Sequence, residues 1–187
     1  SERLKNRQFF WRRQAARCEF RILEKTICSL VLAVKQVFVT PLKIKSVAYC
    51  FTNFTIFEAT DAVGGTWHIH TYPGLACDVW AHSYSFSYRP NPDWSASFVE
   101  QPEIERYLQD CVREFGLTPH VKLNTRISNM RYDDAGHWNL ASESGDLGAF
   151  DVVINAMGNQ HTPLYPEVPG VQEFQGPSFH GTRWNHD

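Results

Sequence analysis

The chain has 187 residues, which is enough for one domain with a hydrophobic core but hardly for two. Hydrophobic residues make up 43% of it and charged residues 20%, a balance typical of soluble globular proteins. The net charge of −2 conceals a division, because residues 1–50 carry a net charge of +8 and residues 51–187 a net charge of −10.

Residues 1–52 form a basic segment. Its Arg-rich start, residues 1–26, predicts a basic helix, while residues 27–52 are compatible with either strand or helix. Such charge leaves open an interaction of residues 1–25 with nucleic acid or an acidic membrane surface. The only aromatic cluster there is Phe9-Phe10-Trp11, so our first expectation is a chain with neither a nucleic-acid nor a membrane partner.

Cysteines and apolar runs bear on the compartment. The longest apolar run, residues 27–39, is interrupted by Lys35 and is too short to cross a bilayer comfortably. The five cysteines are scattered and show no Cys-x-x-Cys or metal-type spacing: Cys18, Cys28, Cys50, Cys77 and Cys111. This pattern predicts reduced thiols in a cytoplasmic protein.

From residue 53 onward the pattern predicts an α/β protein. A β-branched and aromatic run predicts a buried strand over residues 54–57, and residues 59–99 are rich in loop-forming residues. A helix is expected to begin near Gln101-Pro102-Glu103 and to end at Gly116. Its apolar face is expected at Ile104, Leu108, Cys111, Val112 and Phe115. Three further strands are predicted over residues 121–127, 137–141 and 150–155.

Glu58 ends the first of these strands. An acid at this place commonly accepts the ribose hydroxyls of a nucleotide in a βαβ fold, although glutamates at strand ends are also common surface residues. Both interpretations of Glu58 stay open from its position alone.

The run from Gly64 to Asp78 carries the most specific chemistry. Paired glycines, Gly64 and Gly65, permit close approach of the backbone to a planar or phosphorylated ligand. Trp67 and Tyr72 offer flat surfaces, and Asp78 offers a hydrogen-bond acceptor. A metal site at His68, His70, Asp78 and His82 is the weaker interpretation, and we expect no metal. Trp80, Trp94 and Trp138 are expected to pack in the core or under loops.

This run resembles the Baeyer–Villiger monooxygenases, within the wider flavin-containing monooxygenases. Their pattern is Gly-Gly-x-Trp, four residues, an aromatic-Pro-Gly, three residues and Asp, and it is met throughout residues 64–78. A second stretch is similar to the family fingerprint, with matches at Phe174, Gly176, His180 and Trp184. Residues 151–158 resemble the element that ends in Ala-Thr-Gly, so the resemblance covers residues 53–187.

The resemblance implies an incomplete FAD/NAD(P)-binding Rossmann-like domain with a small antiparallel β insertion at about residues 121–141. It implies FAD and NADPH as cofactors, and insertion of oxygen beside a ketone or oxygenation of a heteroatom in a small organic substrate. FAD would contact Glu58, Gly64, Gly65, Thr66, Trp67, Tyr72 and Asp78. Phe174, Gly176, His180 and Trp184 would lie at the hinge of the NADPH domain. No catalytic side chain is expected within the chain, since the family's active-site arginine belongs to a region beyond Asp187.

The amino-terminal part departs from the family pattern. A Gly-x-Gly-x-x-Gly turn should lie about two dozen residues before Glu58, yet residues 29–37 contain no glycine. We therefore expect an atypical segment over residues 1–52, a partial FAD-binding domain over residues 53–187, and weak or absent FAD binding. A non-catalytic flavoprotein remnant or an interaction protein is the alternative function.

Overall fold

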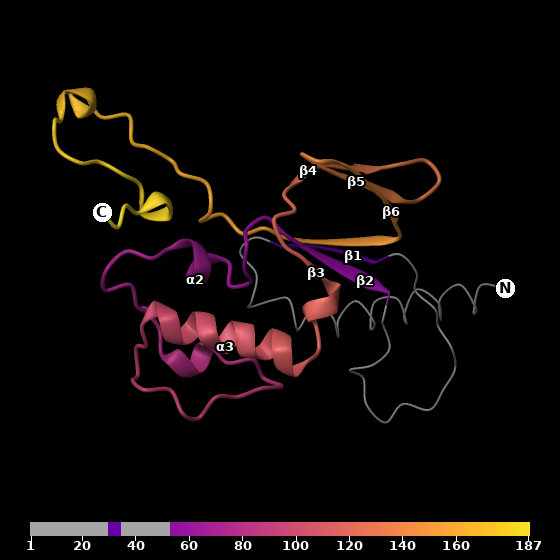
Figure 1. Ribbon diagram of the computed structural model, residues 1–187, viewed down its shortest axis with the longest axis horizontal. Helices are drawn as coiled ribbons and strands as arrows, with labels where there is room; N and C mark the ends of the chain where they lie inside the picture. The colour runs from indigo at the N-terminus through magenta and orange to yellow at the C-terminus, as the bar shows by residue number, and fades with distance from the viewer. Residues whose placement is uncertain (1–29, 35–52) are drawn as a thin grey trace, which may run out of the picture.

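The structure is a computed structural model that describes residues 30–34 and 53–187, so the predictions for residues 1–29 and 35–52 lie outside it (Figure 1). The described strands form two sheets, a four-stranded sheet of order β3-β2-β1-β7 and a three-stranded meander of order β4-β5-β6. The strands of the first sheet are β1 (Leu30–Val34), β2 (Phe54–Glu58), β3 (Val121–Lys122) and β7 (Val152–Ala156). Those of the meander are β4 (Ile127–Tyr132), β5 (Trp138–Ser142) and β6 (Gly145–Phe150). The expected α/β class with a small antiparallel sheet is confirmed.

Strand β1 runs against its neighbours in the four-stranded sheet. It pairs antiparallel with both β2 and β7, whereas β2 pairs parallel with β3. Strands β2, β3 and β7 therefore share one direction, and among the described strands of this sheet β1 opposes them. Leu30, the first residue of β1, lies opposite Glu58 and Ala156, the last residues of β2 and β7.

Helix α3 (Gln101–Glu114) begins and ends where the sequence predicts. Pro102 lies in its first turn, and Gly116 follows it with a φ of +64°, a left-handed conformation that favours glycine. The buried face consists of Gln101, Ile104, Tyr107, Leu108 and Cys111. Phe115, just after the helix, is 40% exposed, with its ring 5.3 Å from that of Tyr88.

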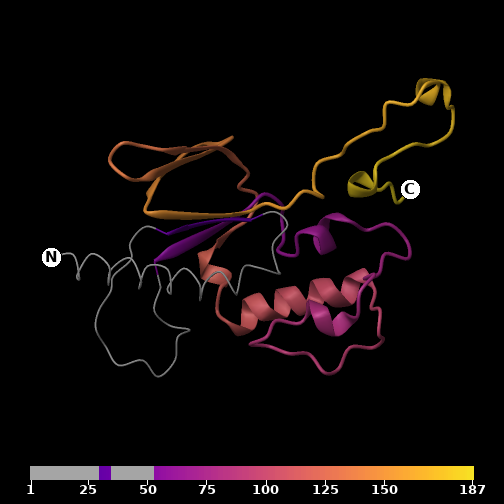
Figure 2. The same cartoon turned by 180° about the vertical axis from the view of Figure 1, so that it is seen from behind.

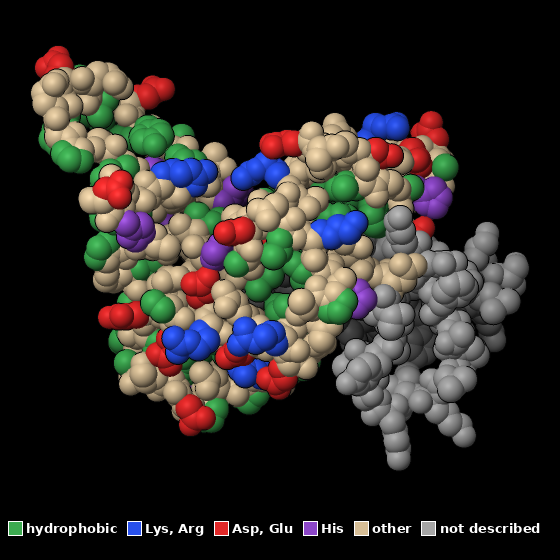
Figure 3. Space-filling view, viewed as in Figure 1, with side chains coloured by type: hydrophobic (Ala, Val, Ile, Leu, Met, Phe, Trp, Pro, Cys, Tyr) green, Lys and Arg blue, Asp and Glu red, His purple; other side chains and the backbone are tan. Residues whose placement is uncertain are grey.

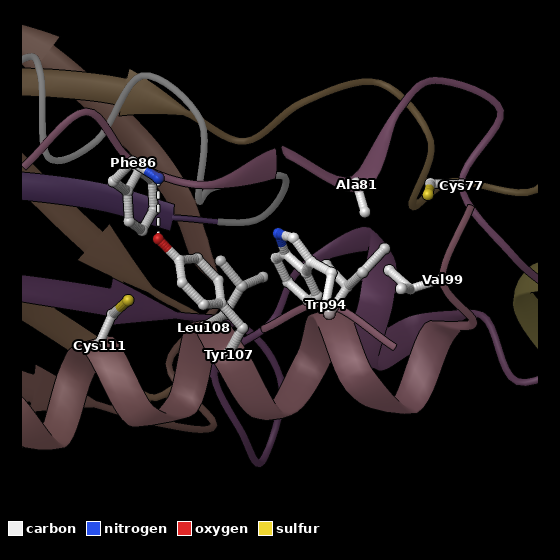
Figure 4. Close-up of a cluster of buried hydrophobic side chains, with 9 residues drawn as sticks. Cys77, Ala81, Phe86, Trp94, Val99, Tyr107, Leu108 and Cys111 are labelled. Atoms are coloured by element: carbon white, nitrogen blue, oxygen red, sulfur yellow. Dashed lines mark hydrogen bonds between the residues drawn. The ribbon is translucent and has the colours of Figure 1, made fainter. Parts of the chain in front are cut away.

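One hydrophobic core joins α3 to the long connection before it (Figure 4). The loop side chains Cys77, Ala81, Phe86, Trp94 and Val99 are buried against the helix. The Tyr107 hydroxyl accepts a hydrogen bond from Phe86 N–H at 2.8 Å and donates to the Arg89 carbonyl at 2.7 Å. This core holds in place a long connection whose regular structure is limited to short helices such as the 3-10 helix Ala81–Tyr84. Trp80 is 69% exposed, so the expectation that it packs is wrong.

The meander covers one side of the four-stranded sheet, and α2 (Thr66–Ile69) and α3 lie on the other (Figures 1 and 2). Phe57, Leu140 and Phe150 are buried between the sheets, with the rings of Phe57 and Phe150 5.9 Å apart. The predicted strand over residues 121–127 is wrong, because Asn124 takes a φ of +51° and the chain passes from β3 to β4 there. The insertion consequently spans residues 127–150 rather than 121–141.

Residues 158–187 form an arm that projects from the sheets (Figures 1 and 2). It contains two 3-10 turns, Val171–Glu173 and Gly181–Arg183, and several large apolar side chains are exposed along it: Leu164, Tyr165, Val168, Val171, Phe174 and Phe179. Within the part of the chain that the structure describes, no helix has the length and apolar character needed to cross a membrane.

Candidate nucleotide site at the end of strand β2

Glu58 is a fully buried carboxylate at the end of β2, with none of its surface exposed. Its Oε1 accepts a hydrogen bond from Thr60 N–H at 2.8 Å and lies 2.8 Å from the Thr60 hydroxyl. That hydroxyl also lies 2.9 Å from the Ala62 carbonyl. Thr60, two residues beyond the strand, thus fixes one oxygen of the carboxylate.

The other oxygen of Glu58, Oε2, is buried as well. Among the described residues, Oε2 has no hydrogen-bond partner. Burial raises the pKa of Glu58, and the interactions with Thr60, the Ala59 backbone and His68 offset this only in part. A buried acceptor without a donor is costly, so this oxygen is suited to receive a hydroxyl from a ligand. Glu58 is therefore not an ordinary surface glutamate, because one of its carboxylate oxygens is held by Thr60 and the other is buried.

A cavity of about 380 Å³ opens beside the end of β2. Its lining comes from β2, α2, the start of the meander and the arm: Phe57, Ala59, Thr60, His68, Ile69, Thr125, Arg126, Ile127, Met157, His161 and Arg183. His161 Nδ1 is likewise buried and has no partner among the described residues. On the face drawn in Figure 3, basic and histidine side chains gather between the base of the arm and the meander. Sequence reasoning missed Arg126, His161 and Arg183, because no local spacing relates these positions.

The paired glycines form the turn that begins α2. Gly64 has a φ of +149° and Gly65, the residue before α2, a φ of +55°. A Cβ at Gly64 would lie 2.8 Å from the His68 Cβ, closer than real contacts allow. The Gly64 and Gly65 carbonyls accept hydrogen bonds from the Trp67 and His68 amides at 3.1 and 3.0 Å. Glycine is therefore required at position 64 for the local fold itself.

His68 joins this turn to two other elements. Its Nδ1 contacts Glu105 on α3 and its Nε2 contacts Asp61 in the loop after β2. Burial lowers the pKa of His68, but hydrogen bonds to Glu105 and Asp61 outweigh burial and raise that pKa overall. Glu105 also accepts hydrogen bonds from Gln101 and Gln109, so it is held firmly on α3. The sequence pattern suggested His68 only as a metal ligand and missed this role.

The aromatic residues of the motif differ in their surroundings. Trp67 is partly buried against the α3 core, with its ring 5.2 Å from that of Tyr84, and its carbonyl accepts a hydrogen bond from Gln101. Thr66 lies at the arm, its hydroxyl 3.5 Å from Gln160 Oε1. Asp78 is exposed. The motif thus brings Trp67 to the core, while Asp78 does not join Glu58 in one cluster.

Two distant motifs meet at Tyr72. Its ring lies 6.1 Å from the ring of Trp184, and Gly181 lies beside it, with the site of a Cβ 3.7 Å from the Tyr72 ring. The hydroxyl of Thr71 lies 2.8 Å from His186 Nε2. The end of the arm therefore returns to the loop after α2.

The remaining fingerprint residues stabilise the arm locally. The ring of Phe174 occupies the space that a Cβ at Gly176 would need, with the nearest ring carbon 2.6 Å away. His180 precedes the second 3-10 turn, and its Nδ1 accepts a hydrogen bond from Thr182 N–H at 3.1 Å. Phe174 and Gly176 therefore contact each other within the arm, and so do His180 and Thr182.

The residues fit one half of a dinucleotide better than the other. Glu58 has one acceptor oxygen without a partner among the described residues, as the acid that binds a ribose would need, but its side chain does not line the neighbouring cavity. A diphosphate normally lies against the turn and helix that follow a parallel first strand. Strand β1 starts, rather than ends, at the edge that contains Glu58, so the described residues do not form that diphosphate site.

A buried acid at the end of a β-strand, followed by a glycine turn, is a feature common in nucleotide-binding α/β proteins. The model of the family described as flavin-binding monooxygenase-like matches residues 42–187. The chain belongs to this family.

Named relatives agree with this assignment. A Baeyer-Villiger monooxygenase of Pseudomonas aeruginosa is 42% identical over 136 residues, which are 72% of this chain and 26% of that protein. One from Streptomyces coelicolor is 42% identical over 137 residues, covering 73% and 26% of the two chains. The chain spans about a quarter of the length of these curated relatives.

Solved structures give the same result. An open crystal structure of cyclohexanone monooxygenase is similar with a TM-score of 0.62 and 32% identity, over 69% of this chain and 26% of that one. The structure of OTEMO in complex with FAD and NADP is similar with a TM-score of 0.62 and 30% identity, over 70% and 26%.

Proposed function

We propose that this chain contributes the middle of the flavin-binding half of an FAD- and NADPH-dependent monooxygenase of the Baeyer–Villiger type. The whole enzyme would insert oxygen beside a ketone, or oxygenate a heteroatom, in a small organic substrate. Family membership and the names of the relatives support the class of reaction. The buried Oε2 of Glu58, which has no partner in the described part of the chain, is the observation that supports nucleotide binding by the chain itself.

The proposed roles follow the motif residues. Glu58 accepts the ribose hydroxyls of the FAD adenosine, and its burial strengthens the hydrogen bonds. Gly64, Gly65, Thr66 and Trp67 line the flavin, and Tyr72 and Asp78 lie near its ring. Phe174, Gly176, His180 and Trp184 form the hinge toward an NADPH-binding domain.

The division of the chain stays a prediction as well. Residues 1–52 are proposed to be a basic segment outside the family's flavin domain, and residues 53–187 part of that domain with its linker. The Rossmann-like character of the sheet and the cytoplasmic location belong to the same proposal. No side chain of this chain is assigned to the oxygen-transfer step.

Equilibrium dialysis of the purified chain against FAD tests the proposal. We expect weak flavin binding that adenosine competes away and that Glu58→Gln reduces by about tenfold or more, because hydrogen bonds to a charged acceptor are lost. Glu143→Gln, at an exposed turn between β5 and β6, is the matched control and should bind FAD as the natural chain does. Equal binding by the Glu58→Gln variant would contradict the assigned role of Glu58.

The second candidate is a non-catalytic remnant that has lost flavin binding. The reversed direction of β1 is the observation that favours it. Bound oxidised flavin absorbs at about 450 nm, and the cofactor carries the chemistry. A preparation that stays colourless at saturating FAD, with no binding dependent on Glu58, would establish the remnant.

A further inference from the structure

The cavity beside the end of β2 is lined by basic and histidine side chains from the arm and from the body of the molecule. His161 and Arg183 reach it from the arm, Arg126 from the connection between β3 and β4, and His68 from α2. Of the described residues that line it, none is an Asp or a Glu. Residues 51–187 carry a net charge of −10, so this lining locally reverses the charge of that part of the chain.

The two arginines of the cavity are available to a ligand. Both are exposed, and neither forms an ion pair with a carboxylate in the described part of the chain. The Arg183 guanidinium donates a hydrogen bond to the Thr182 carbonyl at 2.7 Å, and its other N–H groups remain for an acceptor outside the chain. A guanidinium presents its N–H donors in a fixed plane, a geometry that matches the oxygens of a phosphate group.

The two histidines of the cavity differ in their partners. Both ring nitrogens of His68 are engaged, one with Glu105 and one with Asp61, and neither of these carboxylates lines the cavity. The Nδ1 of His161 is buried and has no partner among the described residues, so Nε2 is the ring nitrogen that can meet a ligand. An Nε2–H group donates a hydrogen bond to an anion. His161 therefore adds a third donor to those of the two arginines.

The rest of the lining includes four apolar side chains: Phe57, Ile69, Ile127 and Met157. The cavity volume of about 380 Å³ is at the lower end of the range of small-ligand sites, about 300–1,000 Å³, and is larger than a phosphate ion fills. Burial of carbon against apolar walls is favourable. Size and lining together suit an anionic head group that carries a small apolar body.

We infer that this cavity binds a phosphate monoester with a small apolar body, and that Arg126 and Arg183 bind its dianionic head. The inference goes beyond the proposed function, because neither arginine is among the residues assigned to FAD. Since Arg126 belongs to the body and Arg183 to the arm, the bound ligand also ties the arm to the body.

Calorimetric titration of the whole chain with phenyl phosphate, inorganic phosphate and benzyl alcohol tests the inference. The ionic strength is kept constant, because exposed charges are screened by salt. Phenyl phosphate should bind with a dissociation constant of about 1 mM or lower. Inorganic phosphate should bind about tenfold more weakly, because it has no apolar body to bury, and the uncharged alcohol should not bind measurably. This comparison of ligands needs no variant and so does not depend on how substitutions fold.

Substitutions locate the site. Arg126→Gln and Arg183→Gln should each weaken phenyl phosphate binding about tenfold, since each removes charge-assisted hydrogen bonds to the head group. Arg131→Gln, at an exposed position of β4 outside the cavity lining, is the matched control and should bind as the natural chain does. Circular dichroism checks the fold of all three variants. Phenyl phosphate should also slow hydrogen exchange over residues 158–187 of the natural chain, and not of Arg183→Gln.

Three outcomes would overturn the inference. Equal weakening by Arg131→Gln would show attraction to the general charge of the surface rather than to the cavity. Inorganic phosphate that binds as tightly as phenyl phosphate would exclude a role for the apolar walls. Absence of binding by both phosphates would exclude the site altogether. None of these results bears on the proposed function, which the dialysis against FAD tests separately.

Discussion

His68 Nδ1 lies 2.7 Å from Glu105 Oε1, a contact that ties the glycine turn to helix α3. The other ring nitrogen lies 2.8 Å from Asp61 Oδ1. A neutral imidazole has one N–H, so it can donate to only one of the two carboxylates, whereas the protonated ring donates to both. The geometry therefore favours the charged form of His68, in agreement with its raised pKa.

The stability of the chain should depend on pH through His68. Because its pKa in the folded chain lies above the ordinary 6.5, the stabilisation is fully present below pH 6.5 and is lost as the pH rises through the raised pKa. We expect a loss of about 1 kcal/mol in the free energy of unfolding, measured with urea at a series of pH values.

The variant His68→Gln should flatten this pH dependence. Glu58 interacts electrostatically with His68, but it remains in both proteins, so the difference between the two curves reports on His68. His82→Gln, at an exposed position in the 3-10 turn Ala81–Tyr84, serves as the control. If the free energy of unfolding of His68→Gln varied with pH as that of the natural chain does, the ion pairs of His68 with Glu105 and Asp61 would be contradicted.

Gly64→Ala should destabilise the chain more than Gly74→Ala. Both glycines have positive φ, +149° and +74°, so both substitutions strain the backbone. At Gly64 the new Cβ would also lie 2.8 Å from the His68 Cβ, whereas nothing lies within 4 Å at Gly74. We expect losses of about 3 kcal/mol and about 1 kcal/mol in the free energy of unfolding. Equal losses in urea unfolding would show that the contact with His68 is unimportant.

Tyr107→Phe should weaken the core around α3. The substitution leaves the Phe86 N–H without its acceptor in a buried place, at a cost of about 1–3 kcal/mol. Burial raises the pKa of Tyr107 to about 12, so its hydroxyl stays protonated at neutral pH and can also donate to the Arg89 carbonyl. Tyr132→Phe, with a side chain that is largely exposed, is the control and should unfold like the natural chain. Equal urea midpoints for Tyr107→Phe and Tyr132→Phe would show that the hydrogen bond from Phe86 N–H to the Tyr107 hydroxyl does not stabilise the core.

The direction of β1 can be tested by cross-linking. Cysteines at Leu30 and Ala156 lie opposite each other in the observed register and should form a disulfide on mild oxidation. A pair at Leu30 and Val152 would be about 13 Å apart, since four residues of strand separate Val152 from Ala156. Peptide mapping by mass spectrometry identifies the bonds in the presence of the natural cysteines. Preferential formation of the second bond would mean that β1 runs parallel to β7.

Local patterns were sufficient to predict α3 and β2. The helix carries its signals within fourteen residues, with Pro102 at its start, apolar residues at helical spacing and Gly116 after it. Strand β2 is a short β-branched and aromatic run that ends in Glu58. These elements depend on neighbours in sequence, which is why the pattern was informative.

Other features depend on contacts that the sequence does not encode locally. Strand β6 was missed because Gly145, Asp146 and Gly148 are typical of turns, yet pairing with β5 extends the segment. The sequence predicted one strand over residues 121–127, but the positive φ of Asn124 separates β3 from β4 there. At the candidate site, the motif indicated Glu58, but its free oxygen depends on Thr60 and on burial by the fold.

Thr60 has a consequence for the choice of sugar. Its backbone N–H and hydroxyl both lie against the same oxygen of Glu58, and the second oxygen has no partner among the described residues. Two hydroxyls on one face of a furanose ring can converge on a single atom, whereas hydroxyls on opposite faces cannot. Under the proposed role of Glu58, adenine arabinoside, the 2′-epimer of adenosine, should therefore bind more weakly than adenosine although its size and polarity are the same.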